Sequence, residues 1–403
     1  MSAMVDSIID VLDVQREERI RLQRNYQALM AEKRREEGVL RRRVGELEAK
    51  AGLRKHPKEI ETVPIKRFKS GEVTYEEYLR FAARSEPFIV ENDTSNPEGA
   101  AMVTPGVPEW TLEKIKSTCA GHQFMLKKES KEAVSKWARL VPIGMCAIED
   151  YIDAILNVNA GSRSEADNKL LASAYLHDVS LVNECAELLD DLVIPKFFVP
   201  DITQKTPETL HYSYPRNYWP SLFIGPGAST SSALHADVLD TAAWMGVVQG
   251  KKHWRIVPPA DRDFLYEFHE TTNVFPTDLF VLDKEKYPLM TLSTIYDAVL
   301  QAGDVLFIPA ASAHQVRNLR GEPTVAVAMN YVDESNLPMF LDKSREMAHT
   351  DGDAFYRYLN SVADAFEQAA ASMGTYEGVE PPNMTFGDYK QGWTYPRGSD
   401  NTM

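Results

Sequence analysis

The residues that most clearly suggest chemistry, by their type and spacing, are His235 and Asp237, within Ser231-Ser-Ala-Leu-His-Ala-Asp-Val238. On a β-strand, side chains two residues apart project on the same side. An imidazole and a carboxylate placed in this way could supply two ligands of a metal site. A second histidine would complete a two-histidine, one-carboxylate set, which leaves three positions open on a redox-active iron. Alone, His-x-Asp is a weak signal, and a surface pair is the simpler interpretation.

Two further segments strengthen the metal interpretation. Residues 302–309, Ala-Gly-Asp-Val-Leu-Phe-Ile-Pro, predict a turn followed by an apolar strand, and His314 lies five residues after Pro309. Residues 243–259 predict a strand, a tight Gly-Lys-Lys hairpin turn and a second strand that ends at two prolines. With these segments in order, a metal site is favoured over a core histidine bonded to backbone.

In these three segments the sequence resembles the Jumonji-C family of cupin-fold oxygenases, which depend on Fe(II) and 2-oxoglutarate. The resemblance is strongest over residues 171–335 and thinner over 65–170. It implies that His235, Asp237 and His314 are the iron ligands, and that Lys252 binds the distal carboxylate of 2-oxoglutarate. A fixed ammonium in a closed barrel suits a dicarboxylate, because a charge partner must offset the cost of burying it.

Within the family, the sequence looks most like the small protein-hydroxylase branch, which includes lysyl hydroxylases. Ala174-Tyr-Leu-His-Asp178 and Ile194-Pro-Lys-Phe-Phe198 match this branch. The resemblance implies cosubstrate contacts for Tyr175 and Ser232, and it places Asn330 where the branch also has an asparagine. For Tyr175, an ordinary role in core packing stays open.

The sequence also departs from the family pattern. Ser312 and Ala313 stand where the family often has aromatic residues, Met245 stands where a splicing-factor-type hydroxylase has a polar cosubstrate contact, and Ala328 replaces a threonine. These changes reduce the polar shell around the cosubstrate. The metal ligands and Lys252 are intact, so activity is still expected. We expect packing or structural roles for a further set of residues: Trp244, Trp254, His177, His211, His253 and His269.

The elements that must position these residues are short β-rich runs separated by Gly and Pro turns over residues 217–332. Such runs indicate an antiparallel sandwich or barrel. We therefore expect a mainly β fold with added helices: a double-stranded β-helix (cupin or jelly-roll) core, a long N-terminal helix and a C-terminal helical bundle. The expected divisions are a helical segment that fits a coiled coil (1–60), a mixed α/β part (61–170), the JmjC cupin domain (171–335), C-terminal helices (336–376) and a loosely ordered tail (377–403). Around the boundary at residue 170, we expect a surface loop at 161–168 and then a buried strand at 170–176.

Two segments could mediate self-association. Residues 5–55 show an interrupted heptad-like seam, which fits a coiled coil and a solitary solvated helix equally well. The C-terminal helices carry an apolar stripe at helical spacing: Phe355, Leu359, Val362 and Phe366. A homodimer through either segment is one reading, and packing of the stripe on the barrel is the equally simple alternative.

Composition narrows the class of protein. The 403 residues are 44% apolar with a net charge of −15, which excludes a wholly disordered chain and argues against a general nucleic-acid binder. Residues 1–58 carry 14 Lys and Arg against 10 Asp and Glu, and the remainder carries 30 against 49. This acidic body favours a basic protein substrate.

No run of the sequence reaches the ~18 apolar residues of a membrane span. Three cysteines without paired spacing predict a reducing compartment, nucleus or cytoplasm, rather than a disulfide scaffold.

The leading hypothesis is a dioxygenase that hydroxylates a side chain, above all Lys, of a protein substrate and releases succinate and CO2. A lysine or arginine N-demethylase is the alternative, because the same metal motif serves both reactions. A non-catalytic cupin that binds partners through its N-terminal helix is the alternative from another class.

Overall fold

The structure, a computed structural model, describes residues 61–91, 104–133, 135–158, 161, 163–207, 210, 217–227, 231–268, 273–350, 354–374 and 376–396. The predicted N-terminal helix and coiled coil, His211 and His269 lie outside these residues. The chain divides into two compact units. One comprises Ile60–Asp283 and Leu292–Met403, and the other comprises Met1–Glu59 and Lys284–Thr291, of which only Lys284–Thr291 is described. The finer divisions predicted from the sequence stay predictions.

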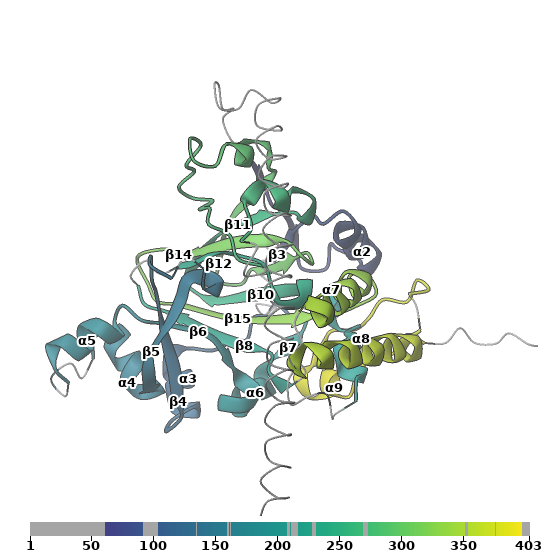
Figure 1. Cartoon of the computed structure of the whole chain (residues 1–403). Helices are drawn as coiled ribbons and strands as arrows, with labels where there is room; N and C mark the ends of the chain where they lie inside the picture. Colours follow the sequence, from purple (N-terminus) through teal and green to yellow (C-terminus); the bar gives the residue numbers. More distant parts are fainter. Residues whose placement is uncertain are drawn as a thin grey trace, which may run out of the picture. The chain divides into compact units, whose positions relative to one another are not determined.

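The larger unit is built on two sheets (Figure 1). The smaller sheet has the order β1-β12-β11-β14-β9, and the larger has the order β2-β3-β13-β10-β15-β8-β6-β4-β5. The pairs β1–β12 and β2–β3 are parallel, and the other pairs in the two sheets are antiparallel. The strands are β1 (Thr62–Pro64), β2 (Lys66–Lys69), β3 (Phe88–Glu91), β4 (Gln123–Glu129), β5 (Leu140–Ala147), β6 (Tyr175–Ser180), β7 (Val193–Ile194), β8 (Ser221–Gly225), β9 (Ser231–His235), β10 (Ala242–Gln249), β11 (Lys251–Val257), β12 (Ile295–Gln301), β13 (Val305–Ile308), β14 (Ala313–Asn318), β15 (Thr324–Tyr331) and β16 (Met384–Thr385).

Strand alternation separates two cores. On β10, Met245 belongs to a hydrophobic cluster that joins the two sheets and also contains Trp254 and Val316 from the smaller sheet. Trp244, one residue earlier, belongs to a second cluster and stacks on Phe198 with ring centroids 5.7 Å apart. Because neighbouring strand residues point to opposite faces, one strand can serve both cores. The predicted mainly β fold with added helices is confirmed.

The predicted hairpin between β10 and β11 is wrong. β10 pairs with β13 and β15 in the larger sheet, whereas β11 pairs with β12 and β14 in the smaller one. The turn at Gly250 therefore carries the chain from one sheet to the other. Gly250 has φ +77°, and a Cβ there would meet the carbonyl oxygen of Pro323 at 2.7 Å, so this crossing favours glycine. A tight turn between two apolar runs looks the same in sequence whether or not the runs pair.

Helices cover the sheets. Figure 1 shows α7 and α8 on one side of the strands and α4 and α5 on the other. The α-helices are α2 (Tyr75–Ala83), α3 (Leu112–Thr118), α4 (Ile148–Ile155), α5 (Glu165–Leu171), α6 (Leu181–Glu184), α7 (Leu337–Thr350), α8 (Ala354–Met373) and α9 (Phe386–Lys390). Within the described residues, no helix is long and apolar enough to cross a bilayer.

Three of the four residues predicted for the apolar stripe of α8 are covered within the chain itself, and the side chain of Phe355 lies outside the described residues. Leu359, Val362 and Phe366 are each at most 2% exposed and pack in one cluster with Phe340 of α7. This arrangement is the intramolecular packing that was the alternative to a dimer face. Self-association of the chain stays a prediction without support from this stripe.

Two local predictions are wrong. The buried strand predicted at residues 170–176 and the loop predicted at 161–168 are replaced by α5 (Glu165–Leu171), which is followed by β6 (Tyr175–Ser180). Ser164 caps this helix by accepting a hydrogen bond from the backbone N–H of Asp167, a signal in the sequence that the apolar run concealed.

The tail predicted to be loosely ordered from residue 377 is packed along its described part, which ends at Pro396. β16 pairs with β7, and α9 buries Tyr389 completely. Tyr395 is 6% exposed, and its hydroxyl lies 2.8 Å from the hydroxyl of Tyr75. Aromatic residues spaced among Pro and Gly anchor this segment, so turn-rich composition did not mean weak attachment.

Cys119 and Cys185 form a disulfide, which the spacing of the cysteines did not indicate. The two cysteines cap the C-termini of α3 and α6 and are fully buried. They are separated by 66 residues, so no local spacing rule could reveal their proximity. The expectation of a reducing compartment, and with it nucleus or cytoplasm, rested on unpaired cysteines and loses that support.

Candidate metal centre and adjoining cavity

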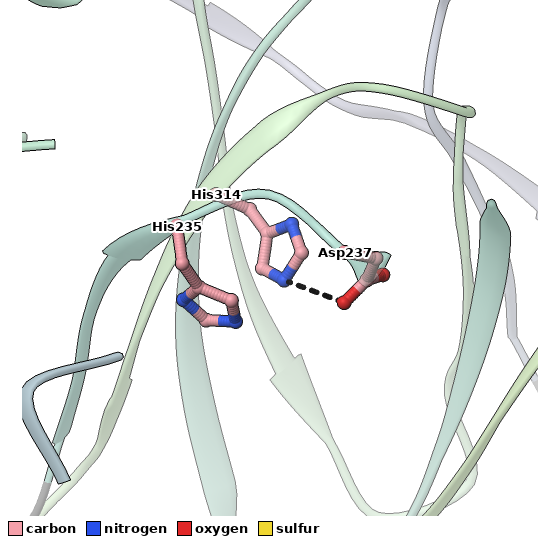
Figure 2. A group of neighbouring side chains, drawn as sticks. All are labelled: His235, Asp237 and His314. Carbon is pink, nitrogen blue, oxygen red and sulfur yellow. Dashed lines mark ion pairs between the residues drawn. The ribbon is translucent and has the colours of Figure 1, made fainter. Parts of the chain in front are cut away.

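The three residues predicted as metal ligands come together. His235 ends β9, Asp237 follows it by two residues, and His314 lies on β14 as the register partner of His235. One potential ligand atom from each residue lies within 4.8 Å of the other two. Figure 2 shows the group, with His314 Nε2 4.0 Å from Asp237 Oδ1. Antiparallel pairing of β9 with β14 thus places the two imidazoles side by side.

The backbone fixes which nitrogen of each imidazole faces the cluster. Nδ1 of His235 lies 2.6 Å from the carbonyl oxygen of Ala233, and Nδ1 of His314 lies 3.2 Å from that of Ser312. A proton on Nδ1 donated to each carbonyl leaves Nε2 with a lone pair, as is common for metal-binding histidines. Burial, reinforced by His314, lowers the pKa of His235 well below its ordinary value, which favours the neutral form that ligands require.

These residues fit a divalent transition metal. Two imidazoles and one carboxylate from one side of an ion form the facial set typical of non-haem Fe(II) sites. Bonds of about 2.1 Å at right angles place neighbouring donor atoms roughly 3 Å apart, so modest rotations would close the present separations. Burial raises the pKa of Asp237, and His314 and Asn330 oppose that rise.

A loop residue holds the ligand-bearing segment in place. The side-chain amide of Asn273 donates to the carbonyl oxygen of Asp237, and its backbone carbonyl accepts from the N–H of Ala236 at 3.1 Å. Arg262 in turn donates to Oδ1 of Asn273 at 2.9 Å and to Asp240 at 2.9 Å. The indole of Trp137 also contacts this segment, donating to the carbonyl oxygen of Ala236 at 3.2 Å.

A cavity of about 370 Å³ adjoins the candidate ligands and contains all seven residues predicted for the site. Its volume lies within the range of small-molecule pockets. The predicted members of its lining are His235, Asp237, His314, Lys252, Tyr175, Ser232 and Asn330.

Lys252 is the most unusual of these residues. Its side chain is 0% exposed, and within the described part of the chain no carboxylate forms a salt bridge with it. Nζ donates to the side-chain oxygen of Asn318 at 2.7 Å and to the hydroxyl of Tyr175 at 3.1 Å. Burial lowers the pKa of Lys252 to about 7. A buried ammonium with only neutral partners is costly unless an anion joins it.

Neighbouring strands leave room for the side chain that accepts a hydrogen bond from Lys252. On β8, a Cβ at Gly225 would lie 2.6 Å from the side-chain nitrogen of Asn318, so glycine leaves room for this amide. Asn318 is also the register partner of Lys252 across β11 and β14. Strand alternation turns Lys252 inward and leaves Lys251 exposed on the other face.

The remaining predicted contacts are less direct. Ser232 is 4% exposed and lines the cavity from β9. Asn330 donates to the hydroxyl of Thr241 at 3.0 Å and lies close enough to Asp237 to influence its pKa, so it flanks the candidate ligands. The departures Met245 and Ala328 are register partners on β10 and β15, and both line the cavity wall.

Sequence reasoning missed several residues of this site. His177, expected to be structural, lines the cavity together with Asp178 and Trp137. Asn318 and Asn273 were also not predicted for the site. Asp178 stood inside a quoted motif, whereas the two asparagines and Trp137 act through contacts that no local pattern encodes.

Residues 74–336 match the cupin-like domain family. The chain belongs to this family. The predicted cupin core and the resemblance to Jumonji-C proteins are thereby confirmed.

Three curated proteins have sequences similar to this chain. "2-oxoglutarate and iron-dependent oxygenase JMJD4" of Mus musculus is 28% identical over 214 residues, covering 49% of this chain and 48% of the relative. "Bifunctional arginine demethylase and lysyl-hydroxylase psr-1" of Caenorhabditis elegans is 26% identical over 307 residues, covering 70% and 64%. "Arginine-specific demethylase JMJ20" of Arabidopsis thaliana is 30% identical over 117 residues, covering 29% and 24%. The chain spans about half the length of the first of these relatives.

Proposed function

We propose that this chain is an Fe(II)- and 2-oxoglutarate-dependent oxygenase that hydroxylates a side chain, above all Lys, of a basic protein substrate. One observation carries the proposal. A single cavity combines a two-histidine, one-carboxylate cluster with the buried Lys252, whose partners among the described residues are all neutral. The first group fits a metal, and the second fits the carboxylate of a cosubstrate.

The spacing of the two groups suits a short dicarboxylate. Lys252 lies four residues before Ile256, which is the register partner of His314. At about 3.3 Å per strand residue, the two positions are roughly 13 Å apart along the sheet. A five-carbon diacid could therefore reach a metal at the cluster with one end and the lysine side chain with the other.

The chain's own residues bind, orient and exclude water. Lys252 and Tyr175 would hold the distal carboxylate, and the backbone carbonyls of Ala233 and Ser312 keep both imidazoles oriented towards the metal. Met245 and Trp254 make the wall apolar, which excludes water from the reacting centre. Iron and 2-oxoglutarate, when bound, supply the dioxygen-dependent oxidation of a C–H bond, with succinate and CO2 as co-products.

The names of the relatives support the class of reaction. One is named for both arginine demethylation and lysyl hydroxylation, and another for arginine demethylation. Demethylation of an N-methyl group would use the same cavity, so it is the second candidate. The non-catalytic scaffold is disfavoured because no described residue gives the buried Lys252 ammonium a charge partner.

The decisive measurement is succinate release by the purified chain supplied with Fe(II), 2-oxoglutarate and basic peptides, with mass spectrometry of each peptide. A gain of 16 Da on Lys supports hydroxylation, and formaldehyde from methylated peptides supports demethylation. His235→Ala and Asp237→Ala should abolish turnover. The matched control is His253→Ala, because His253 lies on the outer face of β11 beside Asp297. Full turnover in the His235 and Asp237 variants would refute the proposal.

A further inference from the structure

The β6 strand is distorted where it borders the cavity. Leu176 is in register with Ile224 of β8, and Val179 with Leu222, so β6 carries one extra residue between these pairs. Such a bulge re-aims side chains and is common beside active sites. As a result, His177 and Asp178 both line the cavity, although neighbouring strand residues ordinarily face opposite sides.

Asp178 sits at the centre of this bulge with a left-handed backbone. Its φ is +56°, a conformation that costs free energy in residues other than glycine and is enriched at functional sites. Asparagine and aspartate tolerate it best. The fold therefore maintains an unfavourable backbone in order to direct this side chain.

The carboxylate of Asp178 is fixed but only partly used. Oδ1 accepts from the hydroxyl of Ser221 at 2.8 Å, and Oδ2 has a longer contact of 3.4 Å with the hydroxyl of Tyr218. In the described residues, no salt bridge joins Asp178 to a Lys or Arg, although Lys127 on β4 attracts it electrostatically. An ionised carboxylate has about four acceptor positions, so Oδ2 retains capacity for a further donor.

Aromatic rings line the same cavity as Asp178. Trp137 is 36% exposed and donates to the carbonyl oxygen of Ala236, and its ring centroid lies 5.9 Å from that of His177. Trp219 lines the cavity as well. A cavity lined by a carboxylate and by indole rings is suited to an organic cation, because both attract positive charge. Burial keeps the pKa of His177 well below its ordinary value, so the neighbouring imidazole is uncharged and does not repel such a cation.

We propose that Asp178, with Trp137 and Trp219, forms the subsite that receives the unmodified ε-ammonium of the substrate lysine. This inference rests on the proposed function and names the group that selects its substrate. A guanidinium binds best to both oxygens of a carboxylate, and Oδ1 of Asp178 already serves Ser221. An ammonium is a point charge that needs only one oxygen, and a trimethylated ammonium has no N–H to donate.

The probes for this subsite are Nα-acetyl-lysine methylamide and its norleucine, arginine and trimethyl-lysine analogues. Their binding is measured by ligand-observed NMR on the full chain loaded with Mn(II) and 2-oxoglutarate, without Fe(II) so that no turnover occurs. The lysine probe should bind best. Asp178→Asn should weaken its binding about 10- to 100-fold, the loss expected for a hydrogen bond to a charged group, and should leave the norleucine probe unchanged.

The control variants separate recognition from folding. Asparagine tolerates the left-handed backbone, and an unchanged Mn(II) affinity of Asp178→Asn verifies its fold. Asp342→Asn, on the exposed face of α7, should bind every probe as the parent does. Lys127→Met should tighten binding of the lysine probe, because it removes a positive charge near Asp178 that would repel the positively charged probe.

Several outcomes would overturn the subsite. Equal binding of the lysine and norleucine probes, or equal binding of the lysine probe to the parent and Asp178→Asn, removes the role of the carboxylate. Tightest binding of the trimethyl-lysine probe assigns the cage to methylated substrates instead. Failure of the proposed function is a separate result, in which the parent protein binds neither Mn(II) nor 2-oxoglutarate.

Discussion

The side-chain amide of Asn273 donates a hydrogen bond of 2.5 Å to the backbone carbonyl of Asp237, 36 residues earlier in the chain. The candidate ligand is thus held by a residue of another loop. Asn273 itself has φ +65° and is fixed by Arg262 and by a bond from its own N–H to Glu267 at 2.6 Å. Removing this support should therefore disturb the metal site without touching a ligand.

Asn273→Ala is expected to weaken Mn(II) binding about 10- to 100-fold, the typical effect of losing an outer partner of a metal ligand. Isothermal titration of the metal-free protein measures this change. The matched control is Asn383→Ala, which removes an amide that accepts from the N–H of Lys196 outside the cavity. An unchanged Mn(II) affinity in Asn273→Ala would show that the loop does not position Asp237.

Lys252→Met should change ligand binding and stability in opposite directions. Affinity for 2-oxoglutarate should fall about 10- to 100-fold, because a hydrogen bond to a charged group is lost. The ligand-free protein should melt at a higher temperature, because the variant removes a buried ammonium whose partners are neutral. Lys251→Met, on the exposed face of the same strand, is the control. Reduced stability of Lys252→Met would indicate that the ammonium already has a charge partner.

The stability of the ligand-free protein should depend on pH through Lys252. Its pKa is about 7 in the folded chain and about 10.4 in an unfolded one. Between these values the unfolded chain binds more protons, so the contribution of Lys252 to stability rises with pH across this window. Denaturant titrations of the parent and Lys252→Met at pH 6 to 10 isolate this contribution by difference. A difference that does not vary with pH would contradict the lowered pKa.

Binding of 2-oxoglutarate should show the reverse dependence on pH. The dianion favours protonated Lys252, so affinity should decrease as pH rises above about 7. At pH 8 the complex should take up a proton, which appears as a dependence of the calorimetric heat on the ionisation enthalpy of the buffer. Heats that are equal in phosphate and Tris would argue against this coupling.

Loss of the Cys119–Cys185 disulfide should destabilise the fold. It closes a segment of 66 residues, and the chain-entropy model assigns a crosslink of that length about 4 kcal/mol. Denaturation of Cys119→Ala/Cys185→Ala under non-reducing conditions should show this loss, while Cys146→Ala changes stability little. Thiol titration of the unfolded, unreduced parent should give one thiol, from Cys146. Three thiols would exclude the pairing.

Much of the cavity could be predicted because its residues follow strand alternation. His235 and Asp237 share one side of an extended segment, and Lys252 is inward because Trp254 and Ile256 are inward on the same strand. Local patterns of this kind need no knowledge of the partner strand. His314 was found through the apolar strand and turn that precede it.

The rest depended on tertiary contacts. Whether β10 pairs with β11 is decided by the strands that lie beside each of them, and these come from distant segments. The bulge at Asp178 exists only relative to the register of β8. Asn273 resembles any polar loop residue until its partners are known. Cys119 and Cys185 meet through the packing of two helices.

The cavity wall has a consequence for how this family can diverge. Met245 and Ala328 face one another across β10 and β15, so a long side chain at one position occupies space beside a short one at the other. Shortening Met245 alone would leave a void, and enlarging Ala328 alone would overpack the wall. Substitutions at positions 245 and 328 are therefore expected to occur together in evolution. A change to threonine at position 328 would therefore first need a smaller residue at position 245, so the order of the substitutions matters as well as their identity.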